Sequence, residues 1–240
     1  LNMTLLNTNI DRIKENESSP QILKNFIEPD KIKDLLNLYQ KLPLTVHNKK
    51  QNVKKKRWIS GFGEDLENWY YEKLKQVLGS FRMDNLVSED KKEILGLFQE
   101  SYSPIGLHVD SGFDQNNFFY KQTLIPLTPF GSTVIFKNRF YKGSTNFTLD
   151  EEELNKKNLG YGQNRRSKEH LDLFKKKPFD SEIHKKYLAH EKIQNLSGLE
   201  VECIFEWEVG SLLVFDRSHL HASSSQIKDK KIGLTTFTKK

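Results

Sequence analysis

Two residues in the segment 107–112 have the side chains and the spacing of a metal site. His108 and Asp110 are two positions apart, and side chains two apart on an extended chain point to the same face. The imidazole and the carboxylate would therefore converge on one point, where they could bind a metal ion together. Among 7 His and 32 acidic residues such a pair also arises by chance, so a hydrogen-bonded surface pair is the alternative.

A second segment, residues 216–223, supplies a further imidazole from His219 or His221. These two share a face of an extended chain, so their spacing does not decide between them. Two imidazoles and one carboxylate on one side of a metal ion leave positions open for substrate and oxygen, which is typical of non-haem iron(II) oxygenases. A structural zinc site would close four positions, usually with Cys, and this chain has only Cys203.

Several other chemistries lack their sequence motifs. The chain has no GxxxxGK phosphate-binding loop, no GxGxxG after a strand and no GxSxG turn for a nucleophilic Ser. His190 and Glu191 begin like a helical zinc-protease motif, but Gln194 stands where the second His would be needed. The zinc-protease interpretation is therefore excluded, and the other three motifs give no support for their reactions.

The composition predicts a folded protein without a membrane-spanning segment. Of the 240 residues, 36% are hydrophobic, and 16 Phe, 8 Tyr and 3 Trp are too many core-forming rings for a disordered chain. The longest apolar runs have four or five residues, whereas a spanning helix needs roughly 20. The chain does not open on a secretory leader, and its single Cys fits a reducing compartment, so we expect a cytoplasmic protein.

The net charge of +6, from 38 basic and 32 acidic side chains, biases the protein only weakly towards anionic partners. The sharpest basic cluster runs from Lys49 to Arg57. It could bind a polyanion, but Trp58 is the one aromatic residue at its edge, and a single-strand nucleic-acid binder would offer several rings for stacking. We expect a solvated loop here, and we do not expect nucleic acid as a partner.

Residues 1–92 are expected to be mainly helical and to support a sheet. One apolar stripe at helical spacing covers residues 32–39 and ends before Pro43, and a second covers residues 66–78 and ends at Gly79. Another helix is expected to start at Ser19 and Pro20, because Ser and Pro favour the first turn.

Residues 93–240 have the period of strands. Short strands are expected at residues 93–102, 107–109, 118–127, 133–136, 201–207, 211–215 and 232–238. Because no βαβ helices separate them, they indicate an antiparallel sandwich or barrel. We expect one domain, residues 1–240, that is mainly β with N-terminal helices.

The segment 142–199 is expected to be a helical insertion between two core strands. It is rich in Lys, Glu and Asn, and helix-like stretches occur around residues 150–154 and 182–193. Long excursions of this kind are often functional lids. Tyr161, Arg165 and Arg166 could therefore close over a substrate.

The order of the His-x-Asp pair, the predicted strands, His221 and Lys231 along the chain resembles that in the iron(II)- and 2-oxoglutarate-dependent dioxygenases. It looks closest to their phytanoyl-CoA and prolyl-hydroxylase-like branches. The resemblance covers residues 102–238 without the insertion, and it implies a double-stranded β-helix, or jelly roll. In that family a His-x-Asp pair and a distal His hold the iron. A basic residue about ten positions beyond the distal His binds the far carboxylate of 2-oxoglutarate, and Lys231 lies 10 residues after His221.

The resemblance implies the remaining site residues as well. It favours His221 over His219 as the third ligand, because Ala222 and Ser223 look like the family's His-x-Ser, and it leaves His219 a possible role in orienting a ligand. Ser223 would donate a hydrogen bond to 2-oxoglutarate, with a backbone-capping Ser as the alternative. Gln122 is the polar residue of its strand that we expect to contact 2-oxoglutarate. The residues Gly131, Ser132 and Thr133 resemble the family's Gly-Gly-Glu-Thr hairpin, with a single Ser in place of the second Gly and the Glu.

The alternation of side chains along a strand independently predicts that Lys231 points towards the inside of the fold. Lys231, Gly233, Thr235 and Phe237 would share one face of the last strand. A buried ammonium needs an anionic partner, and a bound dicarboxylate would provide one. The alternative is a turn residue in the solvated run 228–231. By the same parity, Phe205 and Trp207 are expected to lie in the core.

The resemblance implies a hydroxylase that uses Fe(II), O2 and 2-oxoglutarate, releases succinate and carbon dioxide, and oxidises an unidentified small molecule. Two alternatives stay open. One is a cupin-like metal enzyme that does not use 2-oxoglutarate, and the other is a non-enzymatic β domain that binds polyanions through the basic cluster at residues 49–57.

Overall fold

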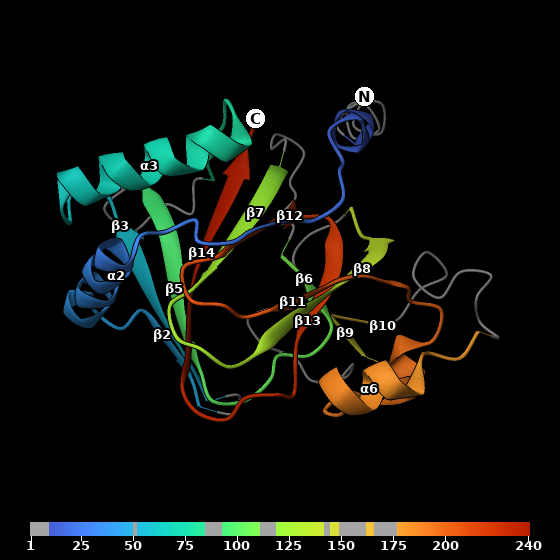
Figure 1. Ribbon diagram of the computed structural model, residues 1–240. Helices are drawn as coiled ribbons and strands as arrows, with labels where there is room; N and C mark the ends of the chain where they lie inside the picture. Colours follow the sequence, from blue (N-terminus) through green and yellow to red (C-terminus); the bar gives the residue numbers. More distant parts are fainter. Residues whose placement is uncertain are drawn as a thin grey trace.

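Two β-sheets form the body of the protein (Figure 1). The structure is a computed structural model that describes residues 10–49, 52–84, 93–110, 119–141, 145–148, 162–165 and 177–240. The large sheet has the order β1 (Gln21–Leu23), β12 (Leu212–Asp216), β7 (Phe119–Pro126), β14 (Lys231–Lys239), β5 (Ile94–Ser101), β3 (Val53–Ile59) and β2 (Val46–Asn48), and β4 (Arg82–Met83) pairs with β14. The small sheet has the order β10 (Gly162–Arg165), β9 (Thr145–Thr148), β6 (His108–Val109), β13 (His219–Ser223), β8 (Ser132–Arg139) and β11 (Val201–Glu206).

The chain alternates between the two sheets. β5, β7, β12 and β14 lie together in the large sheet, while β6, β8, β11 and β13 lie together in the small one, and the pairs within each set are antiparallel. This winding is the jelly-roll arrangement, and the expected mainly β fold is confirmed. All seven strands predicted beyond residue 92 are present.

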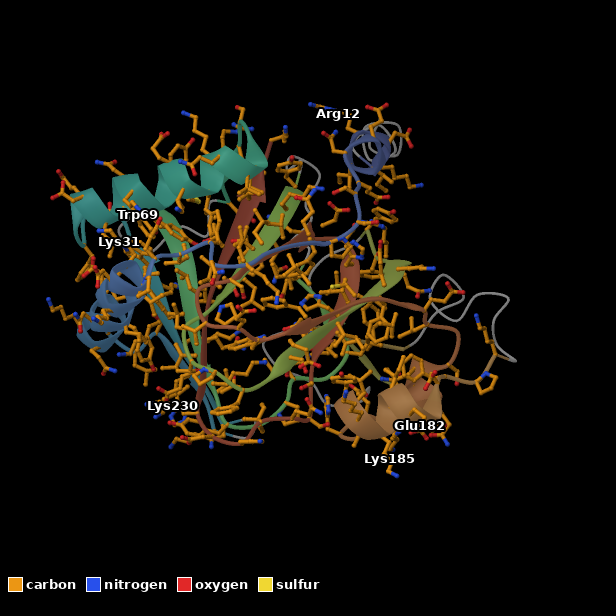
Figure 2. The ribbon with its side chains drawn as sticks, in the orientation of Figure 1. Arg12, Lys31, Trp69, Glu182, Lys185 and Lys230 are labelled. Carbon is orange, nitrogen blue, oxygen red and sulfur yellow. The ribbon has the colours of Figure 1, made fainter. Side chains whose placement is uncertain are left out.

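Two helices cover the large sheet, as expected. α2 (Pro29–Lys41) begins at a Pro and buries one apolar stripe, and α3 (Glu64–Leu78) starts with an acidic turn and ends at Gly79, whose φ is 67°. Trp58 of β3 joins α3 to the sheet, since its ring lies 5.0 Å from that of Tyr70 and 6.2 Å from that of Phe98, and Tyr39 joins α2 to the sheet with its ring 5.7 Å from that of Phe98. Figure 2 shows where the helices meet, with the Lys31 ammonium of α2 over the Trp69 ring of α3.

Two expectations for the first 92 residues are wrong. Ser19 and Pro20 precede the short strand β1, not a helix, and β1 pairs with β12. The basic segment expected to be a solvated loop contains β3, which pairs with β5 along its whole length. Pairing with a neighbouring strand outweighs the low strand propensity of a lysine run. The N-terminal part therefore adds four strands to its helices, and the one-domain interpretation stays a prediction.

The insertion carries β9, β10, α6 (Ser181–Tyr187) and a 3-10 helix at Ile193–Leu196. α6 and the 3-10 helix correspond to the helical stretch expected around residues 182–193, and Asp180 caps α6 through the backbone N–H groups of Glu182 and Ile183. Residues 150–154, Tyr161 and Arg166 lie outside the described residues. Glu182 and Lys185 point outward from α6 (Figure 2). None of the helices in the described part of the chain has the length and apolar character needed to cross a bilayer.

Candidate metal centre

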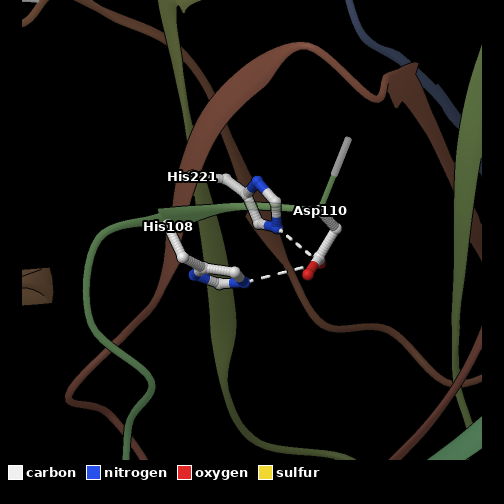
Figure 3. Close-up of side chains that lie close together, drawn as sticks. All are labelled: His108, Asp110 and His221. Atoms are coloured by element: carbon white, nitrogen blue, oxygen red, sulfur yellow. Dashed lines mark ion pairs between the residues drawn. The ribbon is translucent and has the colours of Figure 1, made fainter. Parts of the chain in front are cut away.

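Three side chains of metal-binding types, from two separate parts of the sequence, meet beside the small sheet (Figure 3). His108 lies on β6, Asp110 follows directly, and His221 lies opposite His108 on the neighbouring strand β13. The Oδ2 atom of Asp110 is 3.5 Å from Nε2 of His108 and 3.3 Å from Nε2 of His221. The three ligand atoms lie within 4.8 Å of one another, so one ion could contact all three.

The backbone sets the tautomer of both imidazoles. Nδ1 of His108 lies 2.7 Å from the carbonyl oxygen of Gly106, and Nδ1 of His221 lies 3.0 Å from that of His219. Because a carbonyl only accepts, each Nδ1 must carry the proton. Each Nε2 is then left with a lone pair directed at Asp110. Two such nitrogens and one carboxylate on one side of a point fit iron(II) with open positions.

The three side chains of the cluster shift one another's pKa values. Burial alone would raise the pKa of Asp110, but the two imidazoles hold it well below its usual range. Burial alone would lower the pKa of His108, yet the Asp110 carboxylate raises it, while the Lys55 ammonium opposes that rise. Burial and the neighbouring His108 lower the pKa of His221. A carboxylate that stays ionised while partly buried is suited to binding a cation.

His219 lies outside this cluster. The ladder between β13 and β8 is irregular between His219 and His221, and the ring of His219 is not part of the cluster. Nδ1 of His219 lies 2.7 Å from the carbonyl oxygen of Phe136. The residue orients His221, but through its own main-chain carbonyl and not through its ring.

Gln122 of β7 reaches the metal-ligand cluster directly. Its side-chain nitrogen donates to Oδ2 of Asp110 at 3.3 Å. The side chain is 4% exposed, and its Oε1 has no hydrogen-bond partner among the described residues. The structure thus gives Gln122 a contact with Asp110 of the candidate metal centre that the sequence did not predict. Its predicted contact with 2-oxoglutarate stays a prediction.

Ser223 lines the same cavity. Its Oγ accepts a hydrogen bond from the backbone N–H of Ile105, in the loop that leads to β6. This contact matches the backbone-capping alternative. Donation to 2-oxoglutarate stays a prediction.

The same cavity is also lined by a buried cation, Lys231. Lys231 is 4% exposed, and its Nζ lies 3.8 Å from the centre of the Trp207 ring and 3.5 Å from the carbonyl oxygen of Ser132. Among the described residues no carboxylate pairs with it, and burial lowers its pKa to about 7. The predicted inward face of β14 is therefore correct, because Lys231, Gly233, Thr235 and Phe237 all line the cavity.

Trp207 is a site residue that the sequence analysis missed. It packs against the core between the sheets, as expected, but it also lines the cavity. Its Nε1 donates to Oγ1 of Thr133 at 3.1 Å, so the ring is held over the Lys231 ammonium. A single Trp after a strand gives no signal for this role.

The cavity lined by these residues has a volume of about 220 Å³. Gly131 closes in on the Lys231 side chain, since a Cβ built on this glycine would lie 3.0 Å from Cε of Lys231. Its φ of 138° also disfavours other residues. The turn of residues 131–133 that resembles the family's hairpin therefore packs directly against Lys231.

Glu191 of the insertion supports the metal-ligand strand. Its Oε1 accepts a hydrogen bond from the backbone N–H of Leu107 at 2.5 Å, and its Oε2 accepts one from Asn195. Gly106 permits this approach, because a Cβ there would collide with Glu191 Oε1. The same glycine offers the carbonyl that orients His108. The insertion thus fixes the backbone from which His108 projects into the candidate metal centre.

We expect Glu191→Ala to weaken iron(II) binding about tenfold, in line with losses seen when the partners of ligands are removed. The unpaired Leu107 N–H should also cost about 1–3 kcal/mol of unfolding free energy. Titration with a competing chelator and thermal unfolding measure the two effects. Glu182→Ala, on the exposed face of α6, is the matched control. Unchanged iron affinity in Glu191→Ala would show that this support is dispensable.

The comparisons with solved structures bear on the fold. The chain is similar to an oxidoreductase of the 2OG-Fe(II) oxygenase family from Burkholderia pseudomallei, with a TM-score of 0.50 and 11% identity over 98% of this chain and 89% of that one. It is also similar to the epimerase SnoN in complex with Fe3+, alpha ketoglutarate and nogalamycin RO, with a TM-score of 0.50 and 7% identity over 97% of this chain and 84% of that one. No family model and no curated protein sequence matches the chain. The chain shares the fold of these two enzymes, which confirms the double-stranded β-helix.

Proposed function

We propose that this protein is an iron(II)- and 2-oxoglutarate-dependent dioxygenase that hydroxylates a small organic molecule. One observation carries the proposal. One cavity is lined both by a His-Asp-His cluster and by a buried ammonium that has no carboxylate partner among the described residues. An oxidoreductase of the same fold is assigned to the 2OG-Fe(II) oxygenases, and SnoN binds Fe3+ and alpha ketoglutarate, which supports the same cofactors here.

In this proposal His108, Asp110 and His221 hold the iron, and their backbone partners keep the two Nε2 atoms available. When bound, iron(II) with 2-oxoglutarate and O2 supplies the oxidising power. One oxygen atom ends in succinate and the other in the hydroxyl group of the product, with release of carbon dioxide. The protein binds and orients the reactants and excludes water from the cavity.

Lys231 would bind the far carboxylate of 2-oxoglutarate. An isolated ammonium buried in the fold is costly, and a dicarboxylate removes that cost. A charge-assisted hydrogen bond of this kind contributes about 1.5–3 kcal/mol. Trp207 and Gly131 restrict the space around Lys231, so they would limit the length of the acid that fits.

We expect 2-oxoglutarate binding to take up a proton above neutral pH. The pKa of Lys231 is about 7, so at pH 8 most of the protein carries a neutral amine, and the bound dianion stabilises the ammonium. The affinity of the iron-loaded protein should be flat below pH 7 and fall above it, by up to about tenfold per pH unit. Anaerobic calorimetry in buffers of different ionisation enthalpy measures the uptake. Affinity that does not change between pH 7 and 9 would contradict this prediction.

The test of the function is uncoupled turnover. The protein, given iron(II), O2 and 2-oxoglutarate without a substrate, should release succinate and carbon dioxide in equal amounts. An iron-loaded protein that neither binds nor consumes 2-oxoglutarate would favour the cupin-like alternative. The polyanion alternative loses support, because Lys54 and Lys56 of the basic cluster are engaged with Glu100 and with the Tyr39 carbonyl. A cytoplasmic location remains part of the proposal and rests on the single Cys203.

A further inference from the structure

Asp110 lies just beyond the strand that carries His108. The register partners of β6 end at Val109, so Asp110 has no ladder partner among the described residues. Nη2 of Arg217 instead donates to the Asp110 carbonyl oxygen at 3.4 Å, and Nη1 of the same buried side chain pairs with Asp84 at 2.7 Å. This contact holds the main chain of Asp110, but it does not fix the direction of the carboxylate.

The direction of an Asp carboxylate is a soft degree of freedom, because rotation about the bond to its carboxyl carbon has only broad preferences. Gln122 restrains this rotation, since its Nε2 donates to Oδ2 of Asp110 at 3.3 Å. The same Oδ2 lies 3.5 Å from Nε2 of His108 and 3.3 Å from Nε2 of His221 (Figure 3). The amide of Gln122 thus holds the oxygen atom that both imidazoles approach.

The orientation of the Gln122 amide follows from the chemistry of its neighbour. An ionised carboxylate only accepts hydrogen bonds, so the nitrogen end of the amide must face Asp110. This orientation leaves Oε1 of Gln122 buried without a hydrogen-bond partner among the described residues, which is unfavourable for a polar atom. An apolar side chain would avoid that cost, so the contact with Asp110 accounts for a Gln at this position.

The large sheet keeps the Gln122 side chain in place. Gln122 of β7 lies opposite Phe215 of β12 and Phe237 of β14, and all three residues line the cavity. Phe215 is 2% exposed, and its ring lies 5.1 Å from that of His221. Neighbouring residues of the large sheet therefore contact two of the three side chains in the candidate metal centre.

We propose that Gln122 is a positioning residue of the metal centre, which holds the Asp110 carboxylate so that Oδ2 faces the two imidazoles before the ion binds. The inference rests on the proposed function for the identity of that ion, iron(II). A ligand ordered in advance loses less freedom when the ion binds, so the restraint raises metal affinity. Because Nε2 of Gln122 carries two protons, this role is compatible with the predicted contact with 2-oxoglutarate.

The test measures the iron(II) affinity of the 240-residue protein by anaerobic titration with a competing chelator. Gln122→Met keeps the length of the side chain and removes the amide, so the affinity should fall about tenfold. The titration contains no 2-oxoglutarate, so a lost contact with that acid cannot cause the effect. Gln99→Met is the matched control and should keep the wild-type affinity, because Gln99 lines the same cavity but donates to Oγ of Ser101 at 3.3 Å.

Thermal unfolding of the metal-free proteins separates positioning from a structural role. Gln122→Met removes the unpaired buried Oε1, so its melting temperature should not fall. A residue with a merely structural role would show the reverse, a lower melting temperature with unchanged iron(II) affinity. Gln122→Leu serves in the same way if Gln122→Met folds poorly. Wild-type iron(II) affinity in Gln122→Met, or a loss no larger than that in Gln99→Met, would overturn the inference.

The same samples distinguish this inference from the proposed function, because 2-oxoglutarate consumption is measured separately. An affinity loss in Gln122→Met, in a protein that binds iron(II) but does not consume 2-oxoglutarate, would support the positioning role and count against the dioxygenase. Equal iron(II) affinity in the wild type and Gln122→Met, with 2-oxoglutarate consumed by both, would leave the function intact and refute the positioning role. A wild-type protein that binds no iron(II) would contradict both.

Discussion

Replacing Asp110 with Ala should abolish stoichiometric iron(II) binding and, with it, all iron-dependent consumption of 2-oxoglutarate. Asp110 is the one carboxylate in the cluster, and its Oδ2 is the atom that both Nε2 atoms approach. Loss of a residue that hydrogen-bonds to a metal ligand weakens metal affinity about 10- to 100-fold. Loss of the ligand itself should therefore weaken iron(II) affinity more than about 100-fold. Metal analysis after anaerobic loading, with a chelator titration for the affinity, measures the effect.

His47→Ala is the control for this variant, because it removes an imidazole that is exposed on β2, away from the cluster. We expect it to keep one iron per chain. His108→Ala and His221→Ala should behave like Asp110→Ala. Metal content that is unchanged in all three would mean that the cluster is a hydrogen-bonded group without an ion, the alternative considered for His108 and Asp110 from the start.

Replacing Lys231 with Met should weaken 2-oxoglutarate binding about 10- to 100-fold, which corresponds to the loss of one charge-assisted contact in a buried site. The same change should make the ligand-free protein more stable. Met is apolar and close to Lys in length, and it spares the fold a buried ammonium that no carboxylate among the described residues neutralises. Affinity and thermal stability would then change in opposite directions, as expected for a residue kept for function.

The matched control is Lys230→Met, which removes the same charge from the adjacent, exposed position. It should leave both 2-oxoglutarate affinity and stability nearly unchanged. Calorimetry on the iron-loaded proteins and thermal unfolding of the ligand-free proteins give the two readouts. Lys231→Met with undiminished affinity would place the far carboxylate elsewhere, and the account of this end of the cavity would be wrong.

The sequence predicts the strands with apolar alternation well, and it predicts the pairing of His108 with Asp110 because parity along one strand is a local property. Prediction from the sequence fails for elements that form only through contacts with residues far away in the chain. β3 is a lysine run that becomes a strand only because β5 pairs with it. β13 was not predicted either, although Leu220 and Ala222 alternate with its two His residues, and the fold buries all of it apart from Ser223.

The choice between His219 and His221 could not be made from their spacing, because the two residues lie two positions apart on one strand. Resemblance to a family favoured the residue that the structure places in the cluster. Trp207 and Glu191 were missed as site residues for a different reason. Their contacts with Lys231 and with the Leu107 backbone connect segments far apart in the chain, and spacing rules describe only neighbours on one element.

The most direct measurement is a crystal structure of the protein grown anaerobically with iron(II) and 2-oxoglutarate, with anomalous data collected at the iron absorption edge. The account predicts one strong anomalous peak bounded by His108, Asp110 and His221, with the dicarboxylate extending from it to Lys231. An anomalous map without a peak among these three side chains, or with the iron bound elsewhere, would contradict it.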